Sequence, residues 1–285
     1  MKIVRTYATS ANIGSGFDTL GMCFNLYNEY EFKINSYYEI VGFDKEFQNP
    51  ANNLIISSYE EVFNRLKKTI IPIYLKEIKR NIPPSRGLGS SASCIVAGIM
   101  IANDVLSNPL TKEELFQIAS SLEGHSDNVA PLIFGGFCAS FKSDKYYTTS
   151  LKVNKKLTFT LFIPPFKLST SLARSVLKKE ISLSDAVNNI SSVVATVKAI
   201  ENGDIELLIK SNKDVLHEPF RLPLIDGSSD VLQYAKDNNA SAYISGAGST
   251  MLVISEGKLS GAFIYDNWAI KEVKIEKKGA YIYEK

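Results

Sequence analysis

The chain has 285 residues, and 32 Lys and Arg against 30 Asp and Glu leave a formal net charge of +2 at pH 7. This balance excludes a strong electrostatic attraction to nucleic acid or to an acidic membrane surface, because such binding needs a clustered basic excess. With 45% hydrophobic and 22% charged residues, we expect one large globular domain or two domains of roughly 140 residues each.

Strands and helices alternate along the first half of the chain. The hydrophobic pattern predicts strands at 2–8 and 29–35, a helix at 53–68, a strand at 71–79, helices at 90–106 and 111–122, a further element at 127–134, and strands at 137–141, 146–153 and 157–163. The segment 11–21, between the first two strands, is punctuated by glycine. Thr111 and Glu114 have the spacing of a capping box, which predicts the start of the helix that they open.

After the diproline Pro164–Pro165 the pattern restarts. It predicts helices near 170–178, 184–201 and 228–238, strands at 242–245 and 250–255, a helix near 258–268 and a last strand at 271–277. Since strands and helices interleave in both halves, the sequence indicates an α plus β class with a boundary near residue 155.

Cysteine and histidine are both rare in this chain. Three cysteines, at 23, 94 and 138, form no CxxC pair, so we expect reduced thiols in a cytoplasmic protein. The only histidines are His125 and His217, which excludes a three-histidine zinc site. The longest aliphatic run, at 95–102, is far shorter than a membrane span, and the N-terminus lacks the apolar stretch of a signal peptide.

The strongest local signal for chemistry is the segment 83–93, PPSRGLGSSAS. Two glycines allow a close approach of backbone to a ligand, serine hydroxyls follow, and a helix begins there. The free N–H groups and the positive dipole end of a helix N-terminus bind phosphate. The alternative is a tight turn with a serine cap. A P-loop is excluded, because no GxxxxGK string followed by Ser or Thr occurs. The dinucleotide fingerprint GxGxxA is a weak match, because six residues separate the glycines from the preceding strand.

Two further segments concentrate polar or flexible residues. The segment 122–137 carries Glu123, His125, Asp127 and Asn128 within six residues, and 245–255 is a second glycine-rich loop that leads into an apolar strand. Taken singly, each is explained more simply as a capped turn or a hairpin. Together with the phosphate-loop candidate, they indicate a binding site.

Five motifs carry a resemblance to a known family. They are SANIGSGFD at 10–18, PSRGLGSSA at 84–92, EGHSDNVAP at 123–131, HEPFRLPLI at 217–225 and SGAGST at 245–250. In these motifs and their order, from about residue 3 to about residue 255, the chain resembles the GHMP kinases and, within them, the homoserine kinase family.

The resemblance implies a fold and an activity. The fold is the α+β, two-domain GHMP kinase fold, with an N-terminal ribosomal-protein-S5-like α/β domain over 1–155 and a C-terminal ferredoxin-like domain over 156–285. ATP and substrate are then expected at the junction. The implied activity is that of an ATP:L-homoserine O-phosphotransferase, which forms O-phospho-L-homoserine in threonine biosynthesis. A homodimer is also suggested by similar enzymes.

The resemblance also implies which residues bind ATP and magnesium. The ATP-binding residues it implies are Asn53, near the base, and Pro84, Ser85, Arg86, Gly87, Leu88, Gly89, Ser90 and Ser91. The hydroxyl of Ser91 and the carboxylate of Glu123 match the family's Mg²⁺ ligands, and such a hard oxygen set suits this cation. The alternative for Glu123 is a cap on the loop.

A further set of residues is implied for the substrate and the chemistry. The implied substrate-binding residues are Asn12, Asp18, His125, Asp127, Asn128, Thr170, Arg174, Arg221 and Gly246. An arginine fork suits a carboxylate, although Arg174 is also compatible with an exposed helix position. Asn128, Glu123 and Ser91 are the implied catalytic residues. We hypothesise that Asn128 orients the alcohol while its proton passes to the γ-phosphate, the alternative being a carboxylate base at Asp127.

Two other functions remain open from the sequence. One is a GHMP kinase for another small alcohol, such as mevalonate or a sugar; Asp18, available for an ammonium group, argues against it. The other is a non-catalytic ligand-binding relative, against which the intact Ser91 and Glu123 argue. The family usually has proline where this chain has Tyr7, Ser15 and Ser249, which is expected to affect affinity more than the type of reaction.

Overall fold

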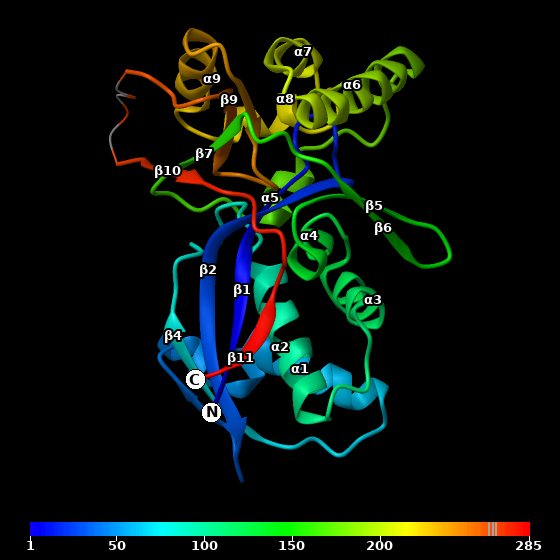
Figure 1. The fold of residues 1–285 in the computed structure, drawn as a ribbon, viewed down its shortest axis with the longest axis vertical. Coiled ribbons are helices and arrows are strands. Elements are labelled where there is room, and N and C mark those ends of the chain that lie inside the picture. Colours follow the sequence, from blue (N-terminus) through cyan, green and yellow to red (C-terminus); the bar gives the residue numbers. More distant parts are fainter. Residues whose placement is uncertain (262, 264, 266) are drawn as a thin grey trace.

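The structure is a computed structural model that describes residues 1–261, 263, 265 and 267–285. Its described residues form two β-sheets with helices packed around each, and the two sheets follow one another along the long axis of the molecule (Figure 1). The mixed α and β content predicted from the sequence is therefore confirmed. None of the helices in this described part is long and apolar enough to cross a membrane.

The first sheet is built on two long neighbouring strands. Its strands are β1 (Lys2–Ala11), β2 (Leu20–Ile34), β3 (Glu39–Val41), β4 (Ile73–Lys79), β5 (Phe137–Lys142), β6 (Tyr146–Leu151) and β11 (Tyr281–Glu284). The order is β11-β1-β2-β4-β3, and all pairs are antiparallel except β3 with β4. Because β2 is 15 residues long, it pairs with β4 near its end and with β5 near its start.

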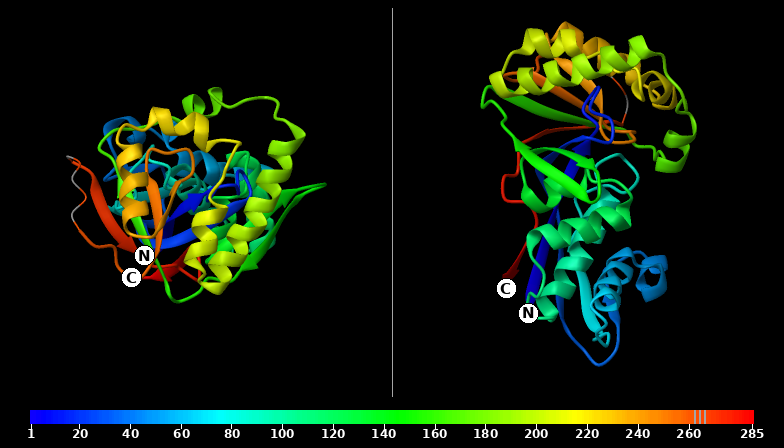
Figure 2. Two further views of the ribbon diagram at one scale, coloured as in Figure 1. Left: turned by 90° about the horizontal axis from the view of Figure 1, so that it is seen from above. Right: turned by 90° about the vertical axis from the view of Figure 1, so that its right-hand side faces the viewer.

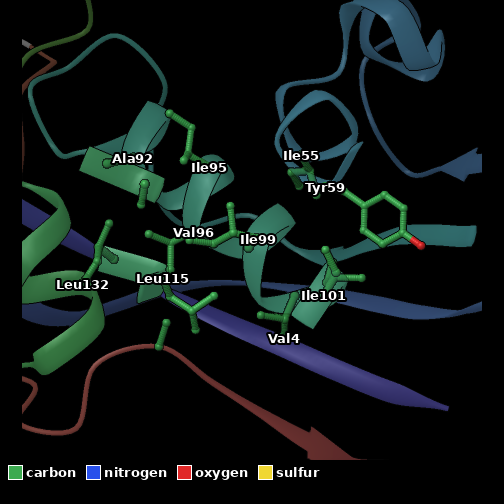
Figure 3. Close-up of a cluster of buried hydrophobic side chains, with 14 of the residues drawn as sticks. Val4, Ile55, Tyr59, Ala92, Ile95, Val96, Ile99, Ile101, Leu115 and Leu132 are labelled. Atoms are coloured by element: carbon green, nitrogen blue, oxygen red, sulfur yellow. The ribbon is translucent and has the colours of Figure 1, made fainter. Parts of the chain in front are cut away.

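Four helices cover one face of the first sheet. They are α1 (Leu54–Arg65), α2 (Ser90–Val105), α3 (Lys112–Glu123) and α4 (Val129–Phe134). The small, aliphatic sequence of α2 predicts burial on most sides, and α2 indeed lies between α1 and β1. Figure 3 shows Ile99 of α2 in this core, with Tyr59 of α1 and Val4 of β1 nearby. This core fixes the start of α2, where the phosphate loop ends.

The second sheet has the antiparallel order β10-β7-β9-β8. Its strands are β7 (Leu157–Ile163), β8 (Ser241–Ile244), β9 (Met251–Glu256) and β10 (Ala269–Val273). The helices of this half are α5 (Thr170–Ser175), α6 (Leu183–Asn202), α7 (Ile205–Ser211), α8 (Glu218–Arg221) and α9 (Ser228–Asp237). As Figure 2 shows, α6, α7 and α9 lie at the end of the molecule remote from the chain termini. Short 3₁₀ helices are η1 (Lys45–Gln48), η2 (Pro50–Asn52) and η3 (Leu222–Leu224).

A shared hydrophobic core joins the two sheets. One cluster of buried side chains combines β1 and β2 residues near the junction with residues of β7, β9, α6 and α7. Within it, the rings of Phe24 and Phe159 lie 5.8 Å apart. The two halves therefore meet through apolar packing as well as through the site described below.

Most of the predicted elements are confirmed, and the differences have physical reasons. The capping box of Thr111 and Glu114 is present at the start of α3. β2 begins nine residues before the predicted strand. The helix expected near 258–268 is wrong for the described residues of that segment, none of which belongs to a helix. Gly257, just before this segment, and Gly261 within it have φ of 77° and 76°, outside the helical region.

The predicted boundary at 155/156 falls in the connection between β6 and β7. After β10 the chain returns to the first sheet, where β11 pairs with β1 and brings Glu284 opposite Lys2. The two termini consequently lie close together at one end of the molecule (Figure 1). The division of the chain at this boundary stays a prediction.

Candidate active site

A cavity of about 460 Å³ lies where the two halves meet. Segments from both halves line it: the loop before α2, the end of α3 and the residues after it, α5, α8 and the glycine-rich loop after β8. The predicted site residues that line this cavity are Asn12, Asp18, Pro84, Ser85, Arg86, Gly87, Gly89, Ser90, Ser91, Glu123, His125, Asp127, Asn128, Thr170, Arg174, Arg221 and Gly246. Residues from five separate motifs thus meet in one place.

The phosphate-loop candidate requires glycine at two positions. A Cβ atom on Gly87 would lie 2.0 Å from the carbonyl oxygen of Ser245, and one on Gly89 would lie 2.0 Å from Oγ1 of Thr9. Gly89 also has a φ of 66° and is the N-cap of α2. Since glycine brings no capping side chain, the first-turn amides of α2 are available to an anion in the cavity.

The same loop is anchored to the C-terminal half of the chain. The hydroxyl of Ser245 donates to the carbonyl of Gly87 at 2.7 Å, and the amide of Thr250 donates to the carbonyl of Arg86 at 3.1 Å. The Arg86 guanidinium donates to the carbonyl of Pro164 at 3.0 Å. The side chain of Arg86 therefore holds the loop against the end of β7 in the second sheet.

Ser91 and Glu123 are in direct contact at the wall of the cavity. The Ser91 hydroxyl donates to Oε2 of Glu123 at 2.9 Å. Glu123 is the last residue of α3, and Gly124 ends that helix with a φ of 86°. Burial raises the pKa of the Glu123 carboxyl above its ordinary value, against the lowering effect of His125 and Ser91. A half-buried carboxylate beside a hydroxyl is the kind of oxygen pair that a divalent cation would stabilise.

His125, Asp127 and Asn128 form one hydrogen-bonded group. His125 Nδ1 lies 2.7 Å from Oδ1 of Asp127, which also accepts the backbone amide of Asn128 at 3.0 Å. Burial lowers the pKa of His125, but the hydrogen bond and charge of Asp127 raise it above its ordinary value overall. The hydroxyl of Thr9 donates to Oδ1 of Asn128 at 2.7 Å. This bond leaves the Asn128 amide nitrogen as the part of the side chain that can donate to a ligand.

The two candidate carboxylate-binding arginines differ in environment. Arg174 makes a forked ion pair with Asp18, with distances of 2.8 and 3.2 Å, and both side chains are more than a third exposed. Arg221 is only 1% exposed. Burial, and after it the charge of Arg174, lowers the pKa of Arg221 to about 10. Two cations are therefore held close together beside one acidic side chain.

The first motif is fixed by contacts with the second glycine-rich loop. Asn12 donates from Nδ2 to the carbonyl of Gly246 at 2.6 Å and accepts the amide of Asp18 at 2.9 Å. Both Asn12 and Asp18 have positive φ, 74° and 50°. The polar atoms of Asn12 thus set the shape of the loop in the free protein. Thr170 opens α5 and lines the cavity near Arg174.

Two predicted residues do not line this cavity. The Leu88 side chain is buried in the shared core. Asn53 lines an adjoining cavity of about 200 Å³, together with Tyr30 and Phe43. There its side chain caps α1, because Oδ1 accepts the amide of Ile55 at 3.0 Å. The two cavities share Leu54, Pro84, Ser90 and Ser91 among their lining residues.

Three residues outside the predicted set contact the site. Thr9 bonds Asn128, while Phe17 and His217 contact the arginines. Each lies within or next to a motif that the sequence already singled out. Their position in or beside a motif was the one feature of the sequence that could have pointed to them. Which side chains they touch follows only from the structure.

Comparison with known proteins shows the family and the fold. The family model described as "GHMP kinases N terminal domain" matches residues 53–136, and "GHMP kinases C terminal" matches residues 196–274. Homoserine kinase of Clostridium beijerinckii is 42% identical over 90% of this chain and 87% of its own length. Homoserine kinase of Clostridium acetobutylicum is 38% identical, covering 98% of this chain and 99% of its own length.

Solved structures give the same result. The crystal structure of homoserine kinase from Cytophaga hutchinsonii superimposes with a TM-score of 0.87 at 27% identity, covering 99% of this chain and 97% of that one. Phosphomevalonate kinase of Streptococcus pneumoniae, at 17% identity and a TM-score of 0.71 over 90% of this chain and 93% of its own, shares the fold alone. The fold and the family expected from the motifs are confirmed. The chain belongs to the GHMP kinases and, within them, to the homoserine kinase family.

Proposed function

We propose that this chain transfers the γ-phosphoryl group of ATP to the side-chain hydroxyl of L-homoserine, with the residues of the 460 Å³ cavity as its active site. The observation that carries the proposal is the charge arrangement opposite the phosphate loop. Arg174 and Arg221 offer two cations for a carboxylate, and Asp18 offers an anion for an ammonium group. A small zwitterion with a hydroxyl group matches this pattern.

ATP is assigned to the two adjoining cavities. The base and ribose fit the 200 Å³ cavity, where the stacked rings of Tyr30 and Phe43 supply apolar surface. The phosphates then lie along residues 84–91, at the N-terminus of α2. Backbone amides and the helix dipole stabilise the phosphate charge there. This arrangement needs no basic excess, which agrees with the net charge of +2.

Mg²⁺ fits the oxygen pair of Ser91 and Glu123. In the described part of the chain no cluster of three or more His, Cys, Asp or Glu could hold a metal ion. Magnesium requires no such cluster, because it binds through one or two protein oxygens and completes its shell with phosphate oxygens and water. The 2.9 Å contact places both oxygens close enough to share one ion. When bound, Mg²⁺ neutralises negative charge on the phosphates.

The substrate would replace the ion pair between Asp18 and Arg174. Its carboxylate takes the place of Asp18 at Arg174 and reaches Arg221, while its ammonium group takes the place of Arg174 at Asp18. An exposed ion pair contributes only about 0.2–1 kcal/mol. The exchange therefore costs little compared with the new charge-assisted hydrogen bonds, each worth about 1.5–3 kcal/mol.

Positioning of the alcohol is assigned to Asn128. Thr9 occupies Oδ1 of Asn128, so its Nδ2 donates to the substrate hydroxyl oxygen. The hydroxyl proton then passes to a γ-phosphate oxygen, because the neutral amide of Asn128 is too weak a base to take it. A carboxylate base at Asp127 is the alternative. That alternative would be favoured if Asp127→Asn abolished kcat at unchanged KM while Asn128→Ala kept the wild-type kcat.

The activity is tested by measuring ADP release with Mg-ATP and a panel of L-homoserine, mevalonate, galactose and shikimate. Turnover on homoserine alone supports the proposal. Turnover on another alcohol of the panel identifies a different GHMP kinase. No ADP release with any alcohol of the panel, together with retained ATP binding, identifies a non-catalytic relative.

The homodimer and the cytoplasmic location stay predictions. Light scattering after gel filtration tests the homodimer.

A further inference from the structure

Phe17 links the two arginines of the site. It lies in the first motif, between Gly16 and Asp18. The centre of its ring is 5.1 Å from the guanidinium carbon of Arg221 and 5.7 Å from that of Arg174. One aromatic side chain is thus within cation–π distance of both cations. Phe17 itself is not among the residues that line the cavity.

His217 is the second residue of this group. Its ring stacks on Phe17 with centroids 5.2 Å apart and planes at 25°. It is fully buried, and its Nε2 donates to the carbonyl of Gly14 at 2.9 Å. The neutral ring then has Nδ1 as an acceptor, which lies 3.4 Å from Nη1 of Arg221. Burial lowers the pKa of His217, in agreement with a neutral ring.

These contacts restrict how Arg221 can point. Its Nε donates to the carbonyl of Ala173 at 3.0 Å, and its Nη1 is shared between the carbonyl of Gly246 at 3.2 Å and His217. Within the described residues, Nη2 is the guanidinium nitrogen that has no protein partner. A guanidinium fixed at Nε and Nη1 presents Nη2 in one direction, which preorganises it for a carboxylate.

The ring of Phe17 also offsets a repulsion. Arg174 and Arg221 must approach each other to bind one carboxylate, and like charges at short range oppose this. The negative face of an aromatic ring attracts a guanidinium, and the attraction is stronger where the pair is shielded from water. Leucine is apolar and somewhat smaller, and it has no aromatic face to attract a guanidinium.

We infer that Phe17 and His217 are positioning residues, which orient Arg221 and hold Arg174 near it so that both cations face the carboxylate of the amino-acid substrate. This inference rests on the proposed function. Neither residue contacts the reacting atoms: His217 is buried behind Arg221, and Phe17 lies outside the cavity lining. Their loss should weaken binding of the substrate and leave ATP binding and chemistry nearly unchanged.

The first test compares Phe17→Leu with Phe17→Tyr in the full-length protein. We expect Phe17→Leu to raise the KM for homoserine about tenfold, with kcat and the KM for ATP within twofold of wild type. Phe17→Tyr retains the ring and should restore the homoserine KM to within twofold. Phe24→Leu is the matched control, because Phe24 pairs with Phe159 in the shared core; it should lower Tm without changing the ratio of the two KM values.

The second test uses His217, in case Phe17→Leu does not fold. His217→Leu removes both hydrogen bonds and should raise the homoserine KM selectively, whereas His217→Gln keeps one donor and one acceptor and should recover part of the effect. Equal increases in the KM for ATP and for homoserine, or an unchanged homoserine KM, overturn the inference. A wild-type protein that does not turn over homoserine overturns the proposed function instead, so the two failures are distinguishable.

Discussion

Gly89 shows how much a single hydrogen atom in place of a side chain matters at this site. We expect Gly89→Ala to lower kcat/KM for ATP at least about 100-fold, because the new Cβ would meet Thr9 and displace Asn128. The matched control is Gly136→Ala. Gly136 also has a positive φ, 74°, but open space around its Cβ position. That variant should lose roughly 1–2 kcal/mol of stability and keep its kinetics. Steady-state kinetics and thermal melts of both variants check this; equal activity of the two would contradict it.

Glu123 allows a test of the metal assignment. Glu123→Gln keeps the shape of the side chain and its contact with Ser91 but removes the charge. We expect the Mg²⁺ concentration for half-maximal activity to rise at least about tenfold and kcat to fall. Glu206→Gln, on the exposed surface of α7, is the control and should behave as wild type. A Glu123→Gln enzyme with the wild-type Mg²⁺ requirement would show that Glu123 only caps the loop.

Glu218 makes stability depend on pH in a defined direction. Burial raises the pKa of this carboxyl to about 8, and its Oε1 accepts the amide of Ile244 at 2.8 Å. Between the ordinary pKa and about 8, the folded state binds a proton that the unfolded state has lost. Stability contributed by Glu218 therefore falls as pH rises through this range, by at most about 1.4 kcal/mol per unit.

Glu218→Gln removes this titration and keeps an oxygen acceptor for Ile244. We expect the variant to gain stability relative to wild type between pH 5 and pH 8, as measured by denaturant unfolding at several pH values. Glu206→Gln is the control, because the carboxylate of Glu206 is exposed. The difference between its free energy of unfolding and that of wild type should stay constant over this pH range. A constant difference for Glu218→Gln as well would show that its carboxyl is ionised throughout.

At the scale of elements, the sequence predicts best where local chemistry alone determines structure. The start of α3 is an example, because Thr111 and Glu114 bond each other's backbone within one turn. β11 is the opposite case. Its four residues are too few for a periodic pattern, and they form a strand because they pair with β1, almost the whole chain away. Phe263 and Trp268 pack against the core of the second half, although no described residue of 258–268 belongs to a helix. Apolar spacing alone could not distinguish this packing from that of a helix.

The capping box gives the prediction at this scale. Thr111→Ala should cost about 1 kcal/mol of stability, because the hydroxyl accepts the Glu114 amide at 3.3 Å. Glu123 lies at the other end of α3, so kinetics should not change. Thr149→Ala, at an exposed position of β6, is the control and should stay within about 0.5 kcal/mol of wild type. Denaturant unfolding measures the free energy of unfolding of both variants. A loss in Thr111→Ala no larger than that in Thr149→Ala would contradict the capping argument.

For the whole molecule, the motifs predict which residues line the site better than they predict which residues contact one another there. Nearly every residue named from the motifs lines one cavity. Sequence could not show that Asp18 binds Arg174, 156 positions away, or that Arg86 braces the loop through the carbonyl of Pro164. Those contacts depend on how the two halves pack, and no local pattern encodes that packing.

The packing between the halves predicts that they unfold together. The shared core and hydrogen bonds such as that from Gly246 to Ala11 cross the junction. The single tryptophan, Trp268, packs in the second half, 6.4 Å from Phe166. Its fluorescence therefore reports that half, whereas far-UV circular dichroism reports the whole chain. We expect the two thermal transitions to coincide, and ATP with homoserine to shift both equally, since the ligands contact both halves. A tryptophan transition several degrees below the circular dichroism transition would mean that the second half unfolds on its own.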